Sequence, residues 1–241
     1  MKMLLLCRIM VAVRQREDEY KKKLYWRYIE QMGRYLGSSC KLCRREGIKL
    51  MLKGVRCETA KCPVEKKQRN LAPGMHGWRR GRISDYGVRL REKQKIKRYY
   101  GLLNDQFMGY FHQAERMKGN TGENLLQLLE LRLDNVIYKL NFAPSRKAAR
   151  QLVNHGHIYV DGRKVDISDF TTKVGNKITL KNSGKSKKQV KQQLDANPNY
   201  STQGWLQLDR DKPEATVVAL PTRDDVQVPV EEQLVVEFCS R

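Results

Sequence analysis

Apolar residues recur every three or four positions in two long stretches of the chain, as they do along the buried face of a helix. The first stretch covers residues 102–117, and the second begins at Asn124, which with Gln127 can cap a helix start. The apolar positions are Phe107, Tyr110, Phe111 and Ala114 in the first stretch, and Leu125, Leu126, Leu129, Leu133, Val136, Ile137 and Leu140 in the second. We expect the first stripe to lie in the core of a helical domain and the second to form the core of another domain.

Residues 145–180 predict a small unit in which a basic helix packs on an antiparallel sheet. Ser145 can cap the start of this helix, and Gly156 can end it. Asp161-Gly162 lies between two β-branched runs, which is a strong signal for a tight hairpin. Residues 177–180 offer a further strand.

The helix of this unit has two different faces. Arg146 and Arg150 stand four residues apart and therefore share a face, with Lys147 beside them. We expect this basic face to point outward. The inward face is predicted to consist of Ala149, Leu152 and Val153. His155 and His157 end the helix, where the helix dipole favours the imidazolium form and a phosphate contact, although structural packing is at least as strong an alternative for either one.

The remaining segments show weaker patterns. Residues 181–199 are polar and lysine-rich and are interpreted as a linker or a mobile surface, while 216–220 and 234–239 are interpreted as short strands or extended segments. The first 31 residues begin with a short apolar run, but Arg8 interrupts it and no small-residue cleavage site follows. We therefore interpret 1–31 as an extension that is not a secretion signal.

Charge is abundant and uneven along the chain. The 241 residues contain 48 Lys and Arg against 26 Asp and Glu, a formal charge of +22. Residues 33–100 alone hold 20 basic and 5 acidic residues, whereas the segment from Ser201 onward holds 4 basic and 8 acidic ones. A protein with this much positive charge is suited to bind a polyanion, either a nucleic acid or an anionic membrane surface. No apolar run is long enough for a transmembrane helix.

The most basic helix candidate is Tyr86–Tyr100, which Ser84-Asp85 can cap. Its positive side chains surround most of the helix, and only Asp85 and Glu92 oppose them locally. A solvated face would usually carry alternating charges, so we expect this helix to lie among phosphates.

Four of the six cysteines fall within 23 residues, as Cys40-x2-Cys43-x13-Cys57-x4-Cys62. Two close pairs joined by a longer loop can present four thiolates to one tetrahedral ion, so the spacing favours a single structural zinc ion. Free thiols, two disulfides and an iron–sulfur cluster are the alternatives that remain open.

No catalytic motif is evident. The chain lacks a Walker loop, a dinucleotide-binding glycine fingerprint, H-E-x-x-H and G-x-S-x-G. We therefore expect a binding protein rather than an enzyme, without a small-molecule substrate.

Several ordered motifs resemble one family closely. They are Met32-Gly-Arg-Tyr, the cysteine quartet with Arg44-Arg45-Glu46-Gly47, Ala72-Pro-Gly-Met-His-Gly77, Ser84-Asp85-Tyr86 through Lys95, Arg132-Leu-Asp-Asn135, Ala149-Arg-Gln-Leu152, His155-Gly-His157 and Val235 to Arg241. From Met32 onward the chain resembles the bacterial-type small-subunit ribosomal protein four family. One departure is Cys239, where the family usually has tyrosine.

The resemblance implies a cytoplasmic protein of the small ribosomal subunit that binds ribosomal RNA (rRNA) directly and nucleates assembly of the subunit body. It also implies contact with messenger RNA (mRNA) where it enters the subunit, and with small-subunit ribosomal protein five and neighbouring proteins, at an interface tied to translational accuracy. Some members bind zinc through four cysteines at these spacings. No membrane partner is implied.

Pattern and resemblance together predict an α+β fold with four segments. These are the extension 1–31, a zinc-containing basic helical domain 32–123, a small RNA-binding domain with a lysine-rich tail 124–200, and a segment 201–241 that packs near the helical domain. The predicted RNA-binding residues are Arg79, Arg80, Arg82, Arg89, Lys93, Lys95, Lys97, Arg98, Arg146, Lys147, Arg150 and His155. The predicted metal ligands are Cys40, Cys43, Cys57 and Cys62.

Two alternatives compete with this interpretation. Pseudouridine synthases carry the same small RNA-binding domain and use a Gly-Arg-Leu-Asp motif, which Arg132-Leu133-Asp134 resembles superficially. However, Leu131 replaces the glycine, and the 107 residues after Asp134 are too few for that catalytic core. A membrane-surface protein would need an amphipathic basic helix with exposed apolar residues, which Tyr86–Tyr100 lacks.

Overall fold

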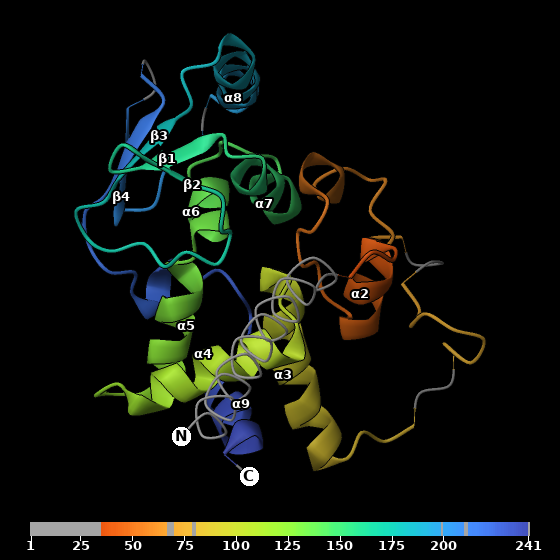
Figure 1. The fold of residues 1–241 in the computed structure, drawn as a ribbon. Coiled ribbons are helices and arrows are strands. Elements are labelled where there is room, and N and C mark those ends of the chain that lie inside the picture. Colours follow the sequence, from red (N-terminus) through yellow and green to blue (C-terminus); the bar gives the residue numbers. More distant parts are fainter. Residues whose placement is uncertain (1–34, 67–69, 79–80, 199, 210–211, 241) are drawn as a thin grey trace, which may run out of the picture. The chain divides into compact units, whose positions relative to one another are not determined.

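The computed structural model describes residues 35–66, 70–78, 81–198, 200–209 and 212–240. All elements described lie in the unit formed by residues 37–241, which contains two hydrophobic cores (Figure 1). The expected extension 1–31 lies outside the described residues. Within the described part of the chain, no helix is long and apolar enough to cross a membrane.

The first core lies among helices from both ends of this unit. The elements around it are α2 (Ser39–Glu46), the short 3-10 helix η1 (Gly54–Cys57), α3 (Asp85–Tyr100), α4 (Asn104–Arg116), α5 (Thr121–Glu130), the 3-10 turn η3 (Arg223–Asp225) and α9 (Glu232–Cys239). The first core consists of Cys43, Leu50, Leu52, Ile96, Tyr99, Tyr100, Leu102, Phe107, Tyr110, Phe111, Ala114, Leu125, Leu126, Leu128, Leu129, Val226, Val228, Val230 and Val235. The aromatic stripe of α4 is buried, as its spacing predicts.

The second core lies between helices and a sheet. Its elements are α6 (Leu133–Lys139), α7 (Arg146–Asn154), α8 (Gly184–Ala196), β1 (Ile158–Val160), β2 (Arg163–Val165), β3 (Lys177–Leu180), β4 (Leu206–Asp209) and β5 (Glu214–Val217). The second core consists of Leu131, Leu133, Val136, Ile137, Leu140, Phe142, Ala143, Ala149, Leu152, Val153, Ile158, Val160, Ile178, Leu180, Val190, Leu194, Trp205, Leu206, Ala215 and Val217. Helices and an antiparallel sheet confirm the expected α+β class.

The five strands form one antiparallel sheet in the order β2-β1-β3-β5-β4. Strands β1 and β2 form the predicted hairpin, in which Asp161 and Gly162 both adopt positive φ, +48° and +76°. Two successive positive φ values are what a two-residue turn of this kind requires, which explains the Asp-Gly pair. Helix α7 begins where predicted, because the Ser145 hydroxyl accepts a hydrogen bond from the Ala148 N–H at 3.3 Å.

The long leucine stripe is divided between the two cores. Leu125, Leu126 and Leu129 on α5 lie in the first core, and the second core starts at Leu131. The expectation that the whole stripe serves one domain is therefore wrong. The cause is the break between α5 and α6, which turns a continuous sequence pattern into two helices.

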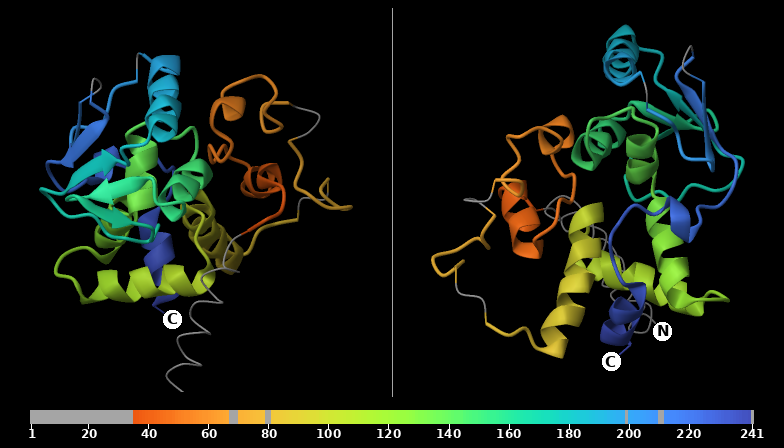
Figure 2. Two further views of the ribbon diagram at one scale, coloured as in Figure 1. Left: turned by 45° about the horizontal axis from the view of Figure 1, so that its top comes forward. Right: turned by 180° about the vertical axis from the view of Figure 1, so that it is seen from behind.

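Two segments differ from their predicted structure. Residues 184–196, expected as part of a linker, form helix α8 because Val190 and Leu194 stand four residues apart and reach the second core. Residues 234–239, expected as a short strand or extended segment, lie in helix α9, which packs against α3 and α5 (Figure 2). Here tertiary packing overrides the strand preference of the β-branched residues.

The segment from Ser201 onward also contributes to both cores. Strands β4 and β5 extend the small sheet and bring Trp205 and Ala215 into the second core, whereas Val226, Val230 and α9 belong to the first. This segment thus crosses between the two halves and ties them together.

Candidate nucleic-acid interface

The predicted metal ligands lie on α2, on η1 and in the loop after it. Cys43, Cys57 and Cys62 are buried, and Cys40 is half-buried; all four are free thiols without disulfide bonds. Burial raises the pKa of the Cys43 thiol, and the neighbouring Cys57, Cys40 and Cys62 raise it further, so the four sulfur atoms interact electrostatically. The backbone N–H of Lys53 donates to Cys57 Sγ at 3.4 Å.

This donor set has the chemistry of a structural zinc site. Zinc in such sites prefers four thiolates, and backbone N–H groups that point at sulfur stabilise the charged form. In the described residues, however, no three His, Cys, Asp or Glu side chains lie together closely enough to hold a metal ion. Zinc binding stays a prediction.

A buried carboxylate links α2 to α3. The side chain of Glu46 has no solvent exposure and forms ion pairs with Arg98 and, at 3.5 Å, with Arg91. Burial raises the pKa of Glu46, while Arg98 and Arg91 oppose that rise. Two of the arginines expected to lie among phosphates therefore neutralise a charge inside the protein.

The other basic residues of α3 are also engaged. Arg89 Nε pairs with Glu237 Oε2 on α9 at 2.8 Å, and Lys95 pairs with Glu92. Burial lowers the pKa of Lys97, and the nearby Lys93 and Arg98 add to that effect. The local sequence showed only Asp85 and Glu92 as opposing charges, whereas the further acidic partners, Glu46 and Glu237, come from distant parts of the chain. Whether α3 contacts RNA is not tested by this arrangement.

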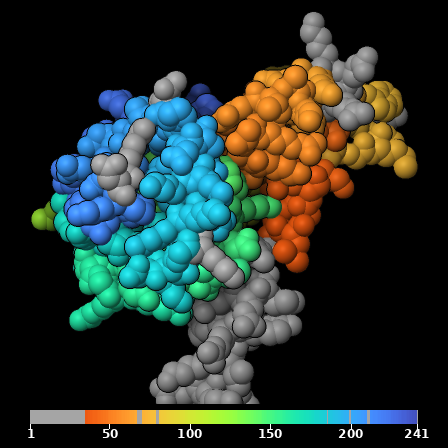
Figure 3. Space-filling model, turned by 90° about the horizontal axis from the view of Figure 1, so that it is seen from above, coloured from red at the N-terminus to blue at the C-terminus, as the bar shows by residue number. Residues whose placement is uncertain are grey.

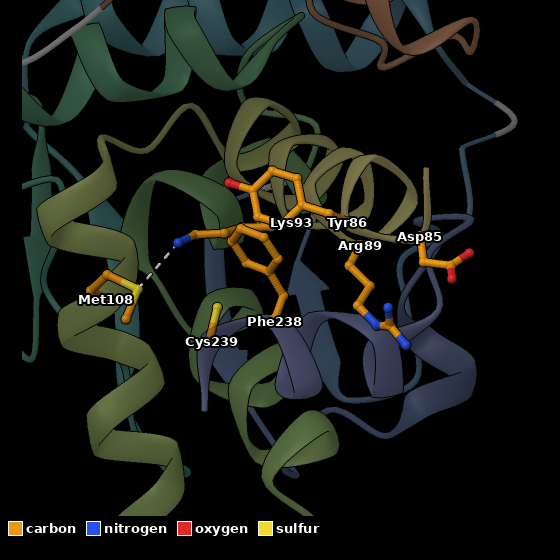
Figure 4. Close-up of a pocket in the computed structure, with 7 residues that line it drawn as sticks. All are labelled: Asp85, Tyr86, Arg89, Lys93, Met108, Phe238 and Cys239. Atoms are coloured by element: carbon orange, nitrogen blue, oxygen red, sulfur yellow. Dashed lines mark hydrogen bonds between the residues drawn. The ribbon is translucent and has the colours of Figure 1, made fainter. Parts of the chain in front are cut away.

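Lys93 faces a cleft of about 740 Å³ between α3, α4 and α9 (Figure 4). The side chain is 8% exposed, and its Nζ donates to Met108 Sδ at 3.4 Å and lies 5.2 Å from the Phe238 ring centre. Arg89 and Cys239 also line the cleft. Lys93 was expected at the RNA surface, but its burial makes it part of the packing between helices.

Arg146 joins the two cores instead of facing outward. Its guanidinium lies 3.8 Å from the ring centre of Tyr99 in the first core and 4.4 Å from that of Tyr138 on α6, and the residue is 7% exposed. Arg146 Nε donates to Asn135 Oδ1 at 2.8 Å, and Asn135 Nδ2 donates to the buried Glu130 carboxylate at 2.6 Å. The expectation of an outward Arg146 is wrong, because three aromatic rings and a buried polar network hold it inside.

The remaining predicted RNA-binding residues occupy the surface or lie outside the described residues. Lys147 Nζ donates to Ser39 Oγ at 2.8 Å, and Arg150 is half-buried. His155 and Arg82 are exposed. Arg79 and Arg80 fall outside the described residues. Helix α7 and its C-cap therefore place Lys147, Arg150 and His155, but not Arg146, at or near the surface.

Asp134, the residue that the enzyme alternative would need, is held by a buried arginine. Arg132 Nε lies 3.2 Å from Asp134 Oδ1, and Arg132 Nη2 lies 3.0 Å from Oδ2. The same guanidinium donates to the Tyr110 hydroxyl at 3.0 Å and pairs with Asp169. The Arg-x-Asp pattern thus forms a structural ion pair.

Some residues with a clear structural role went unnoticed in the sequence. Glu130, Asn135 and Tyr99 form the junction around Arg146, and nothing local in the sequence distinguishes them from ordinary helix residues. Gly54 is different, since a Cβ there would lie 2.1 Å from the Pro144 carbonyl oxygen. A glycine in the middle of the cysteine loop was the available signal for this close approach.

The two halves of the molecule match two known domains. The profile described as "Ribosomal protein S4/S9 N-terminal domain" matches residues 34–130, and that described as "S4 domain" matches residues 131–178. The fold is therefore that of a two-part protein in which an S4 domain follows a helical S4/S9-type region.

The chain aligns with curated relatives over their full length. The chain is 52% identical over 210 residues to "Small ribosomal subunit protein uS4" of Thermoanaerobacter sp. (strain X514), 53% identical to that of Pelobacter propionicus and 50% identical to that of Geobacter sp. (strain M21). Each alignment covers 87% of this chain and 100% of the relative. The chain belongs to the small ribosomal subunit protein uS4 family. The expectation of a ribosomal protein and not an enzyme is confirmed, and the pseudouridine synthase alternative is not favoured.

Proposed function

We propose that this protein is a structural constituent of the small ribosomal subunit that binds small-subunit rRNA directly and nucleates assembly of the subunit body. The observation that carries the proposal is the set of contacts by which Arg146 of the S4 domain reaches the core of the helical region. Because Arg146 links the two halves, their surface cations keep a fixed spacing. An RNA junction whose phosphates match that spacing would be held in one conformation.

Binding would act through electrostatics and geometry. Lysine and arginine side chains displace counterions from phosphates, which supplies affinity, and the fixed spacing of the two halves supplies selectivity for a folded RNA. We assign direct contact to Arg82, Lys147, Arg150 and His155, because these side chains lie at or near the surface. The cations of α3 would contribute mainly through the ion pairs that hold α2 and α9 in place.

We further propose two contacts beyond rRNA. The sequence Arg79-Arg80-Gly81-Arg82 is strongly basic, which suits mRNA where it enters the subunit. The acidic C-terminal segment is a poor phosphate ligand and suits a protein partner such as small-subunit ribosomal protein five. Its helix α9 borders the cleft that Arg89 and Lys93 line.

The cysteine loop would hold one zinc ion through Cys40, Cys43, Cys57 and Cys62. When bound, the ion would supply a structural cross-link between α2 and η1. Purified protein should then contain about one zinc per chain, and Cys57→Ser should lose it while Cys239→Ser keeps it. Zinc near zero in protein prepared under reducing conditions would refute this assignment.

Chemical footprinting on small-subunit rRNA tests partner and metal together. We expect the full chain to protect a discrete multi-helix junction, and a zinc chelator to weaken that protection. Protection that is spread evenly over the RNA, or equal on an unrelated RNA of the same length, would contradict the proposed function.

A further inference from the structure

We propose that the groove between α8 and the β3–β5 part of the sheet is a second phosphate-binding surface, separate from α7, which takes the backbone of RNA. The proposal rests on the proposed function and adds a contact area to it. The groove has a volume of about 480 Å³. Helix α8 lies on the surface in Figure 3 (light blue), next to the segment that carries β4 and β5 (darker blue).

The sequence of α8 places its lysines along the groove. Val190 and Leu194 point into the second core, whereas Lys187, Lys188 and Lys191 are exposed and line the groove. Lys187 and Lys191 stand four residues apart, so the helix rise separates them by about 6 Å along the axis. This separation resembles that of consecutive phosphates along an RNA strand. Binding one strand would therefore require no rearrangement of the helix.

Among the described residues, the opposite side of the groove adds a further cation and no unpaired acid. Lys212 is exposed and lines the groove just before β5. The acidic residue that lines it, Glu214, is already paired with Lys177 at 2.7 Å. Lys187 donates to the Asn182 amide oxygen at 2.8 Å. In the described residues, none of the four groove lysines forms an ion pair, which contrasts with Arg89, Arg91 and Arg98 of α3.

The chemistry of the groove favours RNA over a protein partner. Protein interfaces rely on apolar or aromatic anchors in well-packed pockets. Of the apolar residues that line this groove, Leu180 and Leu194 are buried in the second core, and the half-buried Pro213 is neither large nor aromatic, so none offers such an anchor. Lysine ammonium groups on long flexible stems act as point charges for phosphate, so a row of them suits a backbone whose sequence is not read.

The first test compares the salt dependence of rRNA binding for the wild type and the triple variant Lys187→Gln, Lys188→Gln, Lys191→Gln. Each lost phosphate contact lowers the slope of log K against log salt by about 0.7–0.9, so we expect a reduction of about 2–3 and an affinity roughly 10- to 100-fold weaker at about 0.1 M salt. The three side chains are exposed, so the thermal transition should stay unchanged.

The matched control removes the same charge elsewhere. Lys53, Lys118 and Lys173 are exposed lysines that do not line the groove, and their triple glutamine variant should lower the slope by less than 1. Equal losses in the two variants would show a general charge effect and overturn the proposal. If rRNA binding by the wild type depends steeply on salt and the groove variant shows the same slope and affinity, the groove proposal alone fails. If the wild type does not prefer rRNA, the proposed function fails first.

A second readout does not depend on variants. Brief acetylation of the wild-type chain should modify Lys187, Lys188, Lys191 and Lys212, and bound rRNA should protect these four more than Lys118 and Lys173. Protection that appears only when other small-subunit proteins are added, and not with rRNA, would assign the groove to a protein partner and overturn the proposal.

Discussion

Helices α3 and α8 are both rich in basic residues, but they use them in opposite ways. On α3, Arg91 and Arg98 are matched by Glu46 from α2, Arg89 is matched by Glu237 from α9, and Lys93 is buried. The described lysines of α8 have no acidic partner. The net charge of a sequence segment therefore overstates the positive charge that is accessible to a ligand. Folding pairs some basic side chains with acidic ones from distant segments and leaves other basic side chains unpaired. The predictions below test this contrast, beginning with the largest effect.

Arg146→Ala should cause the greatest loss of stability. The change removes the cation held between Tyr99 and Tyr138, leaves Asn135 Oδ1 without its donor, and opens a cavity between the two cores. We expect the free energy of unfolding in urea to fall by about 3 kcal/mol or more. Lys188→Gln, an exposed cation of α8, should change it by less than about 0.5 kcal/mol. Similar small losses for both variants would contradict the assignment of Arg146 to the junction.

Gly54→Ala should be the next most harmful. A Cβ at this position would lie 2.1 Å from the Pro144 carbonyl oxygen, and the backbone φ is +59°. Gly47 has a similar φ of +72° but open space around it, so Gly47→Ala measures the backbone cost alone, about 1 kcal/mol. We expect Gly54→Ala to exceed that cost by at least about 1–2 kcal/mol, because the cysteine loop must move away from the second core. Equal losses at both glycines would show that the contact has no energetic weight.

Alkaline pH should weaken the junction. Burial raises the pKa of Tyr200 to about 12, and its hydroxyl donates to the Lys139 carbonyl oxygen at 3.0 Å. Because the folded-state pKa lies above the ordinary value of 10, the folded state holds this proton more tightly. Its contribution to stability is complete below pH 10 and is lost as the pH rises toward 12. Between pH 10 and 12, the slope of the free energy of unfolding against pH reports the protons that differ between the folded and unfolded states. Tyr200→Phe should lower that number by about one, so the stability should fall less steeply with pH. Tyr86→Phe, at an exposed site, should leave the slope unchanged.

The smallest effect should come from the exposed ion pair of α3. Glu237 is about half exposed, so a double-mutant cycle of Arg89→Gln and Glu237→Gln should give a coupling of about 0.5 kcal/mol or less. The cycle of Arg98→Gln and Glu46→Gln should give more than about 1 kcal/mol, since Glu46 is buried. A larger coupling energy for the exposed pair than for the buried pair would contradict the claim that burial determines which ion pairs of α3 stabilise the fold.

Local patterns predicted the local structure well. The Asp161-Gly162 hairpin, the Ser145 cap and the buried stripe of α4 depend on neighbours in the sequence, so the chain itself carries their signal. Helix α9 and the split between α5 and α6 depend on packing against distant elements. Their sequence patterns were misleading. A β-branched run can form a strand or a packed helix, and a leucine-rich run can form one helix or two.

The candidate site was only partly predictable for the same reason. The exposed positions of Arg82 and His155 agree with the expected surface role, whereas Arg146 and Lys93 proved to be buried. Helical spacing correctly placed Arg146 and Arg150 on related faces, but it could not show that Tyr99 from another helix covers one of them. Conversely, the lysines of α8 were predicted to lie in a linker, because the two apolar residues Val190 and Leu194 gave too weak a signal for a helix that packs on the second core.

Salt titration of rRNA binding tests the central claim most directly. If surface cations in a rigid frame bind the RNA and about 6–10 phosphates are neutralised, the affinity of the full chain for small-subunit rRNA should fall by about 10³–10⁵ between 50 and 200 mM salt. Its preference over an unrelated RNA of equal length should persist at the higher salt. An affinity that hardly responds to salt, or that is the same for both RNAs, would contradict the account.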